Sequence, residues 1–329
     1  MTSSAGRRPV VLVAGASAAA PPPGIEAAAA SVDLVYAESP DAVAESIGDA
    51  DAVFAWRPDR ALLEPNLPRA RRLRWIQSAS AGVDRLLYPA LVASDITVTN
   101  ARGVFDDAMA EYAIGCMLVF AKGLATTILH SRDGTWEYRN TEPLAGRLLV
   151  VVGAGPIGTA VARKASALGM HVEGVATVPR PTEAPYRRIA GSDDLPQAIL
   201  AADYVVNALP LTDRTRGAFD ERAFAAMKPT ARFLNLGRGA TVDEDALVRA
   251  LREGRIAGAA LDVFRTEPLP ATSPLWGMAN VIVSPHMAGD LEGWEARVVD
   301  IFRDNVGRWI RGERLRNVVD KARGYVPTS

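Results

Sequence analysis

The feature that most constrains the fold is an alternation of short apolar runs, rich in β-branched residues, with alanine-rich segments of helical composition. This alternation is typical of parallel sheets covered by helices. It predicts two doubly wound parallel-sheet domains of the α/β class, one built from each of two series of strands. The first series is 10–13, 32–36, 52–56, 73–77 and 96–99; the second is 148–152, 172–175, 204–209, 232–236, 258–263 and 281–284.

Two helical segments decide how these series divide into domains. Apolar residues recur at helical spacing from 107 to 130, which predicts one long helix between the series. Residues 291–310 also read as a helix, but no further strands follow, so we expect this helix to pack back on the first domain. We therefore assign residues 1–110, completed by 290–329, to a substrate domain, and 111–289 to a second domain.

Charge and cysteine content narrow the classes of partner. Lys and Arg number 37 against 38 Asp and Glu, with a net charge of -1, so we expect neither nucleic acid nor a membrane surface as partner. The single cysteine, Cys116, forms no internal disulfide, which fits a reducing compartment. The apolar run that ends at Gly15 is too short for a signal sequence. We expect a cytoplasmic protein with a small-molecule substrate and no metal site.

A glycine-rich turn follows the first strand of the second series and precedes a helical segment at 159–168. In this context the first glycine permits a tight turn, the second lets a pyrophosphate approach the backbone, and the third lets helix and strand pack closely. Helix N–H groups would then stabilise the phosphate charge. A turn without a ligand is the alternative. The turn residues are Gly153, Ala154, Gly155, Pro156, Ile157 and Gly158.

The end of the next strand bears on the choice between NAD and NADP. An NAD site normally places a carboxylate there for the ribose hydroxyl, but Ala176 occupies this position and Thr177 follows. Glu173 lies mid-strand, where its side chain would miss the ribose. A 2′-phosphate would meet no repulsion, so NADP is favoured and NAD remains open. The arginines just downstream are Arg180, Arg187 and Arg188.

Five ordered motifs resemble those of the D-isomer-specific 2-hydroxyacid dehydrogenases, in particular the glyoxylate/hydroxypyruvate reductases. The resemblance implies a flavodoxin-like substrate domain, a Rossmann dinucleotide-binding domain, an active site in the cleft between them, and usually a homodimer. The motifs are Gly153–Gly158, Asn207–Thr212, Asn235–Gly239, Ala260–Phe264 with Glu267-Pro268, and Ser284-Pro285-His286; Asn100–Val104 with Ala110-Glu111 extends the match.

Three residues of these motifs fit the chemistry of keto-acid reduction. Such a reaction needs a cation that holds the carboxylate and polarises the carbonyl, and a proton for the developing alkoxide. Arg238, between two glycines that would allow close approach to a ligand, supplies the cation. His286, at the end of a strand, is the expected proton donor, and Glu267 matches the family position that orients it. Each could instead be an ordinary polar residue of a loop.

The resemblance also implies cofactor contacts. It assigns Asp262 to the nicotinamide carboxamide, although a carboxylate at a strand end could simply cap a turn. We expect the remaining contacts from Leu209, Pro210, Leu236, Gly237 and Gly289.

Substrate contacts are expected from the first domain. Ala81, Gly82 and Val83 resemble the loop whose backbone N–H groups bind the substrate carboxylate. Trp56-Arg57 falls where family members contact the variable end of the substrate; the phosphate-binding arginine of phosphoglycerate dehydrogenases aligns with Trp56, and Arg57 would replace it only after a one-residue slip. This favours a small unphosphorylated keto acid. Trp136 either contacts substrate or packs.

These observations predict an oxidoreductase that transfers a hydride between NAD(P)H and a small 2-keto acid or D-2-hydroxy acid. Two alternatives remain open at this point. One is a corepressor-like interaction protein that senses the nicotinamide cofactor, and the other is a formate- or phosphite-type dehydrogenase.

Overall fold

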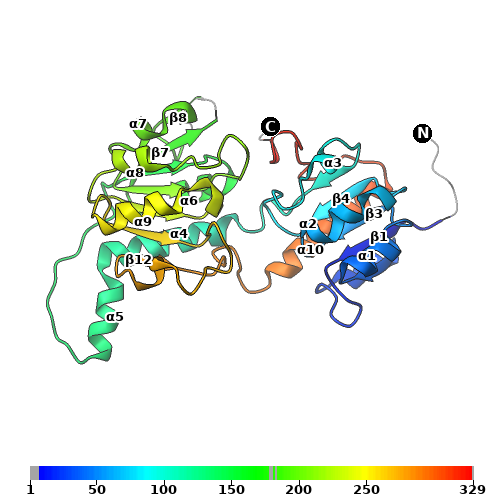
Figure 1. Cartoon of the computed structure of the whole chain (residues 1–329), viewed down its shortest axis with the longest axis horizontal. Helices are drawn as coiled ribbons and strands as arrows, with labels where there is room; N and C mark the ends of the chain where they lie inside the picture. Colours follow the sequence, from blue (N-terminus) through cyan, green and yellow to red (C-terminus); the bar gives the residue numbers. More distant parts are fainter. Residues whose placement is uncertain (1–6, 178–180, 182–183, 328–329) are drawn as a thin grey trace. The chain divides into compact units, whose positions relative to one another are not determined.

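The structure is a computed structural model that describes residues 7–177, 181 and 184–327 (Figure 1). The chain forms two compact units: unit 1 is Met1–Val104 with Leu291–Ser329, and unit 2 is Phe105–Asp290. The first boundary lies six residues before the one we predicted, at 104 rather than 110. The reason is that helix α4 (Asp106–Lys122) packs along its length against α6 (Pro156–Ala167) and so belongs to unit 2.

Unit 1 contains a five-stranded parallel sheet with the order β2-β1-β3-β4-β5. This is the flavodoxin-like order, and it confirms the predicted parallel α/β fold. The helices are η1 (Ile25–Ala30), α1 (Pro40–Ser46), α2 (Arg60–Leu63), η2 (Glu64–Arg69), α3 (Pro89–Val92) and α10 (Trp294–Ile310). The strands are β1 (Val10–Ala14), β2 (Asp33–Ala37), β3 (Ala52–Ala55), β4 (Trp75–Ser78) and β5 (Thr97–Thr99).

Helix α10 returns to unit 1 and covers its sheet. Phe302 is fully buried and stacks on Phe54 of β3, with ring centroids 4.3 Å apart, and on Trp75 of β4, with centroids 5.9 Å apart. Val319 N–H then donates to the carbonyl of Val98 in β5. The end of the chain therefore completes the core that the first strands begin.

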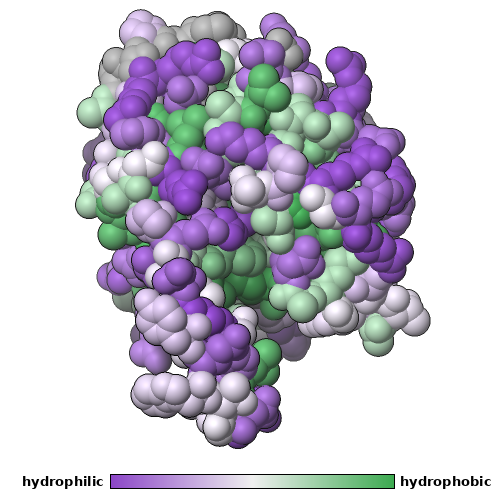
Figure 2. All heavy atoms as spheres, turned by 90° about the vertical axis from the view of Figure 1, so that its left-hand side faces the viewer, coloured by the Kyte–Doolittle hydropathy of each residue, from purple (hydrophilic) through white to green (hydrophobic). Residues whose placement is uncertain are grey.

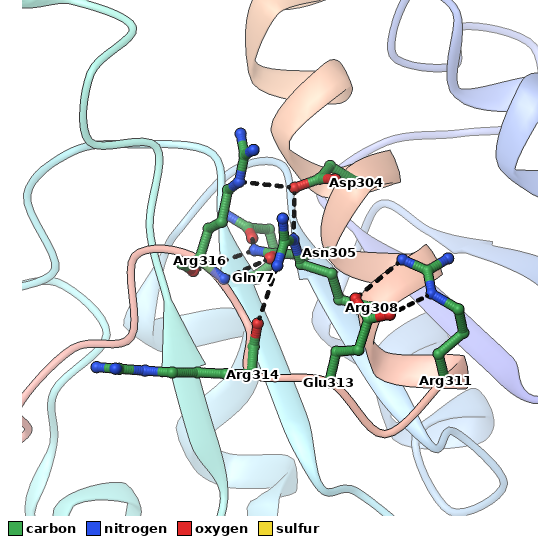
Figure 3. A network of polar contacts seen from close by, with 8 residues as sticks. All are labelled: Gln77, Asp304, Asn305, Arg308, Arg311, Glu313, Arg314 and Arg316. Atoms are coloured by element: carbon green, nitrogen blue, oxygen red, sulfur yellow. Dashed lines mark hydrogen bonds and ion pairs between the residues drawn. The ribbon is translucent and has the colours of Figure 1, made fainter.

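A buried polar contact fixes α10 at this place (Figure 3). Asn305 is fully buried; its amide donates to Gln77 Oε1 at 2.9 Å and its carbonyl oxygen accepts from Arg316 N–H at 2.8 Å. Because a buried polar group is costly without a partner, this arrangement specifies one position of the helix. Around it lie ion pairs of Asp304 with Arg308 and Arg316, and of Arg311 with Glu313.

Unit 2 contains a seven-stranded parallel sheet with the order β12-β11-β10-β9-β6-β7-β8, a Rossmann order extended by one strand. The three-residue strand β8 is not among the predicted strands. The helices are α4, α5 (Leu124–Arg132), α6, η3 (Ser192–Asp194), α7 (Leu195–Ile199), α8 (Glu221–Ala226), η4 (Gly239–Thr241), α9 (Glu244–Arg252) and η5 (Pro274–Gly277). The strands are β6 (Leu148–Val152), β7 (His171–Ala176), β8 (Ile189–Gly191), β9 (Tyr204–Asn207), β10 (Arg232–Asn235), β11 (Gly258–Leu261) and β12 (Val281–Val283).

The single long helix predicted over 107–130 is wrong. Gly123 adopts φ 59° and ψ 34°, a left-handed conformation that ends α4 and begins α5, and the two helices are bent by 66°. Helix α5 contains no buried residue and projects from unit 2, as Figure 2 shows in its lower part.

Neither a membrane span nor a metal cluster is found within the described residues. No single helix there has the length and apolarity to cross a bilayer, and only the bent pair α4 and α5, taken together, passes by length and composition. The same residues contain no group of three or more His, Cys, Asp or Glu side chains able to hold a metal ion.

Candidate active site

The glycine turn joins β6 to α6 and has two kinds of glycine. A Cβ on Gly153, which adopts φ 104°, would lie 2.7 Å from the Ala208 carbonyl, and one on Gly158 would lie 2.1 Å from the Gly153 oxygen. These two glycines are therefore required by packing within the protein. A Cβ on Gly155 would meet nothing within 4 Å.

The space at Gly155 lies at the N-terminus of α6. Gly155 is the N-cap and has no side chain to cap the helix, and Pro156 occupies the first turn. The N–H groups of this turn, together with the helix dipole, are suited to a phosphate, and Ile157 lies half-buried beside them. These residues fit the pyrophosphate of a dinucleotide.

At the end of β7 the structure places Ala176 and the exposed Thr177. The carboxylate of Glu173 forms an ion pair with Arg188, with 2.9 Å between Oε2 and Nη2. Arg180 lies outside the described residues. One contact that the sequence did not indicate is Tyr186, which is buried against Gly174, with its hydroxyl 3.4 Å from Thr159 Oγ1 of α6.

Arg238 lies in the loop after β10, and a buried polar network fixes its backbone. Thr241 Oγ1 donates to the Arg238 carbonyl at 2.6 Å, and Asn207 Nδ2 donates to Thr241 Oγ1 at 2.7 Å and to Asn235 Oδ1 at 2.9 Å. Both asparagines and Thr241 are at most 1% exposed. The Arg238 guanidinium donates to the carbonyl of Gly237 at 2.9 Å.

The two glycines beside Arg238 are packed against other loops of the protein. A Cβ on Gly237 would lie 2.6 Å from the Leu209 carbonyl oxygen, and one on Gly239 would lie 1.9 Å from the Phe264 carbonyl group. These glycines therefore bring three loops of the protein together; their close approach to a ligand stays a prediction.

The other predicted cofactor positions lie in these same loops. Leu209 N–H donates to Asn207 Oδ1 at 3.1 Å, and the Pro210 carbonyl accepts from Thr215 Oγ1 at 2.6 Å. Leu236 is buried. Gly289 is packed closely, since a Cβ there would lie 3.2 Å from the Phe105 side chain.

His286 and Glu267 are brought together. His286 Nδ1 lies 2.9 Å from Glu267 Oε2, and the second oxygen of Glu267 accepts from Phe264 N–H at 3.0 Å. An ionised carboxylate only accepts hydrogen bonds, so Nδ1 carries the hydrogen and Nε2 is left to exchange a proton. The His286 side chain is 42% exposed, which leaves it accessible to a ligand.

Asp262, at the end of β11, is 2% exposed and is bonded to the loop that carries His286. Its Oδ1 accepts from Ser284 Oγ at 2.6 Å and from Met287 N–H at 2.9 Å, and its Oδ2 accepts from Ala288 N–H at 3.1 Å. The carboxylate thus caps the turn that carries His286; its contact with the nicotinamide carboxamide stays a prediction.

The predicted substrate residues belong to unit 1. The carbonyls of Ala81 and Gly82 accept from Asn100 Nδ2 and Ser80 Oγ, each at 2.5 Å, and Val83 is buried, so this loop is held in place. Trp56 follows β3 and stacks on Trp294, with ring centroids 5.8 Å apart and an interplanar angle of 12°; Arg57 is exposed. The other two histidines lie apart from the His286 loop, His130 in the last turn of α5 and His171 at the start of β7.

Comparison with protein families gives one match. Residues 114–288 match the family described as "D-isomer specific 2-hydroxyacid dehydrogenase, NAD binding domain". This range includes the glycine turn, Arg238, Glu267 and His286.

Similar proteins include a glyoxylate reductase from Korarchaeum cryptofilum, 31% identical over 302 residues, a match that covers 88% of this chain and 90% of the relative. A D-3-phosphoglycerate dehydrogenase from Methanocaldococcus jannaschii is 33% identical over 278 residues; the match covers 84% of this chain but only 53% of that protein's length. Among solved structures, an NADPH-dependent glyoxylate/hydroxypyruvate reductase from Sinorhizobium meliloti, in complex with NADP and sulfate, superimposes with a TM-score of 0.81 at 26% identity, covering 97% of this chain and 100% of that one.

Proposed function

Because the chain belongs to the D-isomer specific 2-hydroxyacid dehydrogenase family, we propose that it is an NAD(P)-dependent oxidoreductase that reduces a small 2-keto acid to the D-2-hydroxy acid. The observation that carries the proposal is the joint presence, in unit 2, of an open glycine turn, the hydrogen-bonded pair His286–Glu267, and Arg238 on a loop fixed by buried side chains.

Three side chains have separate roles in this reaction. When bound, the nicotinamide cofactor supplies the hydride that reaches the carbonyl carbon. The Arg238 guanidinium holds the substrate carboxylate and polarises the carbonyl, because it stays charged and offers forked donors. His286 donates a proton from Nε2 to the developing alkoxide. Glu267 orients the imidazole through its hydrogen bond with Nδ1.

The cofactor is NADP rather than NAD on this proposal. Ala176 places no carboxylate against a 2′-phosphate, and the similar Sinorhizobium structure holds NADP. The substitution Ala176→Asp tests the assignment. It should weaken NADPH binding by charge repulsion and leave NADH binding equal or tighter, as measured by fluorescence titration of both cofactors; unchanged preference would refute it.

The substrate on this proposal is an unphosphorylated keto acid such as glyoxylate or hydroxypyruvate. Backbone N–H groups of Ala81–Val83 would bind its carboxylate, and Trp56, held by Trp294, would face its short variable end, with Arg57 beside it. Because its indole is held by this stacking, Trp56 would limit the size of that end of the substrate. Trp56→Ala should therefore raise kcat/KM for bulky 2-keto acids relative to glyoxylate, and a fall for all substrates alike would argue against this placement.

We further propose that the protein is a cytoplasmic homodimer, with neither nucleic acid nor membrane as partner, and that the projecting segment of unit 2 meets a second copy. Ile128 and Leu129 of α5 and Trp136 and Tyr138 beyond it are 62%, 55%, 101% and 87% exposed. The segment is nevertheless ordered by its own contacts, such as Arg139 with Thr127 at 2.8 Å. Large apolar side chains on a fixed projection are typical of an interface. Trp136→Ser with Ile128→Glu should give a monomer in light scattering after gel filtration.

The experiment that tests the activity is loss of reduced-nicotinamide absorbance with glyoxylate, hydroxypyruvate, pyruvate and bulkier 2-keto acids. Arg238→Ala should abolish turnover without altering the melting temperature, and Arg249→Ala, which breaks an exposed ion pair with Glu221, serves as the matched control. Near-normal turnover in Arg238→Ala would refute the mechanism. Tight cofactor binding without turnover of any acid would favour the cofactor-sensing interaction protein, and turnover of formate or phosphite would favour the formate- or phosphite-type dehydrogenase.

A further inference from the structure

Asp262 accepts hydrogen bonds from three successive backbone N–H groups of the loop that carries His286. The Asp262 carbonyl accepts from His286 N–H at 2.8 Å, and its carboxylate accepts from the N–H groups of Met287 and Ala288. These contacts fix the backbone of His286 and of the two residues that follow it. They explain how a residue other than glycine can keep φ 54°, which is unfavourable for an L-amino acid.

The orientation of the Asp262 carboxylate is in turn fixed by Ser284. The Ser284 hydroxyl donates to Oδ1 at 2.6 Å, the shortest hydrogen bond that this carboxylate makes, and Ser284 is itself 6% exposed. A chain of contacts therefore runs from a buried side chain to the proton donor: Ser284, Asp262 and the His286 loop.

Resting on the function proposed above, we propose that Ser284 is a positioning residue for proton transfer: through Asp262 it fixes the His286 loop, so that Nε2 meets the substrate oxygen. A carboxylate has about four acceptor sites, and the loop uses three of them. One site on Oδ2 remains for the cofactor carboxamide, so the same carboxylate would hold the proton donor and the cofactor. Ser284 contacts neither group itself.

The test compares Ser284→Ala with Ser284→Thr, which keeps the hydroxyl. We expect Ser284→Ala to lower kcat by about ten- to a hundredfold, the loss typical of a slightly misplaced catalytic group. The solvent deuterium isotope effect on kcat should rise, because proton donation becomes slower. Ser284→Thr should keep the kcat and the solvent isotope effect of the wild type.

A second readout needs no bound cofactor. The chain has three histidines, so selective ¹⁵N labelling of imidazoles gives three sets of signals, and His286→Gln assigns one of them. Ser284→Ala should shift or broaden the His286 signals and leave those of His130 and His171 in place. Ser94→Ala is the matched control, since it removes a serine hydroxyl bonded to Leu91 in unit 1; it should change neither kcat nor the signals.

The outcomes separate the two proposals. An inactive wild type would refute the proposed function, and the imidazole signals would still test the positioning of His286. An active wild type with unaltered kcat, isotope effect and His286 signals in Ser284→Ala would refute the role of Ser284. Loss of activity that Ser284→Thr does not restore would equally overturn it.

Discussion

Replacing Gly155 by alanine should separate cofactor binding from folding. Gly155 has φ −83° and ψ −167°, which alanine adopts without strain, and the added Cβ meets no protein atom within 4 Å. Stability should therefore change by less than about 1 kcal/mol. The methyl group would instead occupy the space in which a pyrophosphate approaches the backbone.

The expected loss of affinity follows from the contacts that this methyl group would disturb. A hydrogen bond from a backbone N–H to a charged phosphate contributes about 1.5 to 3 kcal/mol. Loss of one such bond corresponds to a rise of about 10- to 150-fold in the Kd of NADPH. Isothermal titration calorimetry measures this change directly, and a thermal melt shows that the variant is folded.

Gly158→Ala provides the contrast, because the same methyl group there would lie 2.1 Å from the Gly153 oxygen and 2.8 Å from Val151 Cγ1. Backbone cannot yield as a side chain can, so this variant should lose at least about 2 kcal/mol of stability despite the better helix propensity of alanine. If Gly155→Ala binds NADPH as the wild type does, the glycine turn does not hold the pyrophosphate and the reasoning is refuted.

Three further predictions concern stability and reactivity. Burial raises the pKa of the Cys116 thiol to about 11, so the native protein should not react with a thiol reagent at pH 8, whereas the unfolded chain should react at once. Burial opposes ionisation of Asp51, but hydrogen bonds from Val10 N–H and Arg72 outweigh burial, so the pKa of Asp51 is lowered. The ionised carboxylate therefore stabilises the folded protein above about pH 4, and this contribution is lost as the pH falls through the lowered pKa. The stability difference between wild type and Asp51→Asn should thus shrink on acidification, and a constant difference in urea unfolding would contradict this. Asn305→Leu should cost on the order of 3 kcal/mol, since it removes the buried hydrogen bond to Gln77 and leaves the part-buried N–H and carbonyl of Arg316 without this partner. A loss below about 1 kcal/mol would show that water replaces the asparagine.

The features that could be predicted from the sequence are those set by a few neighbouring residues. Strand alternation and the turn from Gly153 to Gly158 are patterns within a few neighbouring residues, and both appear in the structure as expected. The break at Gly123 was missed because apolar residues continue at helical spacing on both sides of it, and a single glycine is tolerated inside a helix. Strand β8 was missed because its three residues are too few to show the alternation of apolar and polar residues typical of a strand.

The parts of the site that sequence reasoning missed depend on contacts between distant segments. Asn207 supports Arg238 through Thr241, which is 34 residues further along the chain, and Ser284 bonds Asp262, 22 residues away. No local pattern encodes such a pair. The only signal available was a polar residue at the end of an apolar strand, which marks Asn207, Asn235 and Ser284 alike without saying what each one bonds.

Unit 1 takes its strands from the start of the chain and α10 from the end, whereas unit 2 is continuous from Phe105 to Asp290. On a ribosome, the sheet of unit 1 would emerge long before Phe302 and Asn305 exist to cover it. Unit 2 can reach its native state while synthesis is still under way. The segment made first, up to Val104, is therefore the last to become native, and the rings of Phe54 and Trp75 stay uncovered until α10 docks.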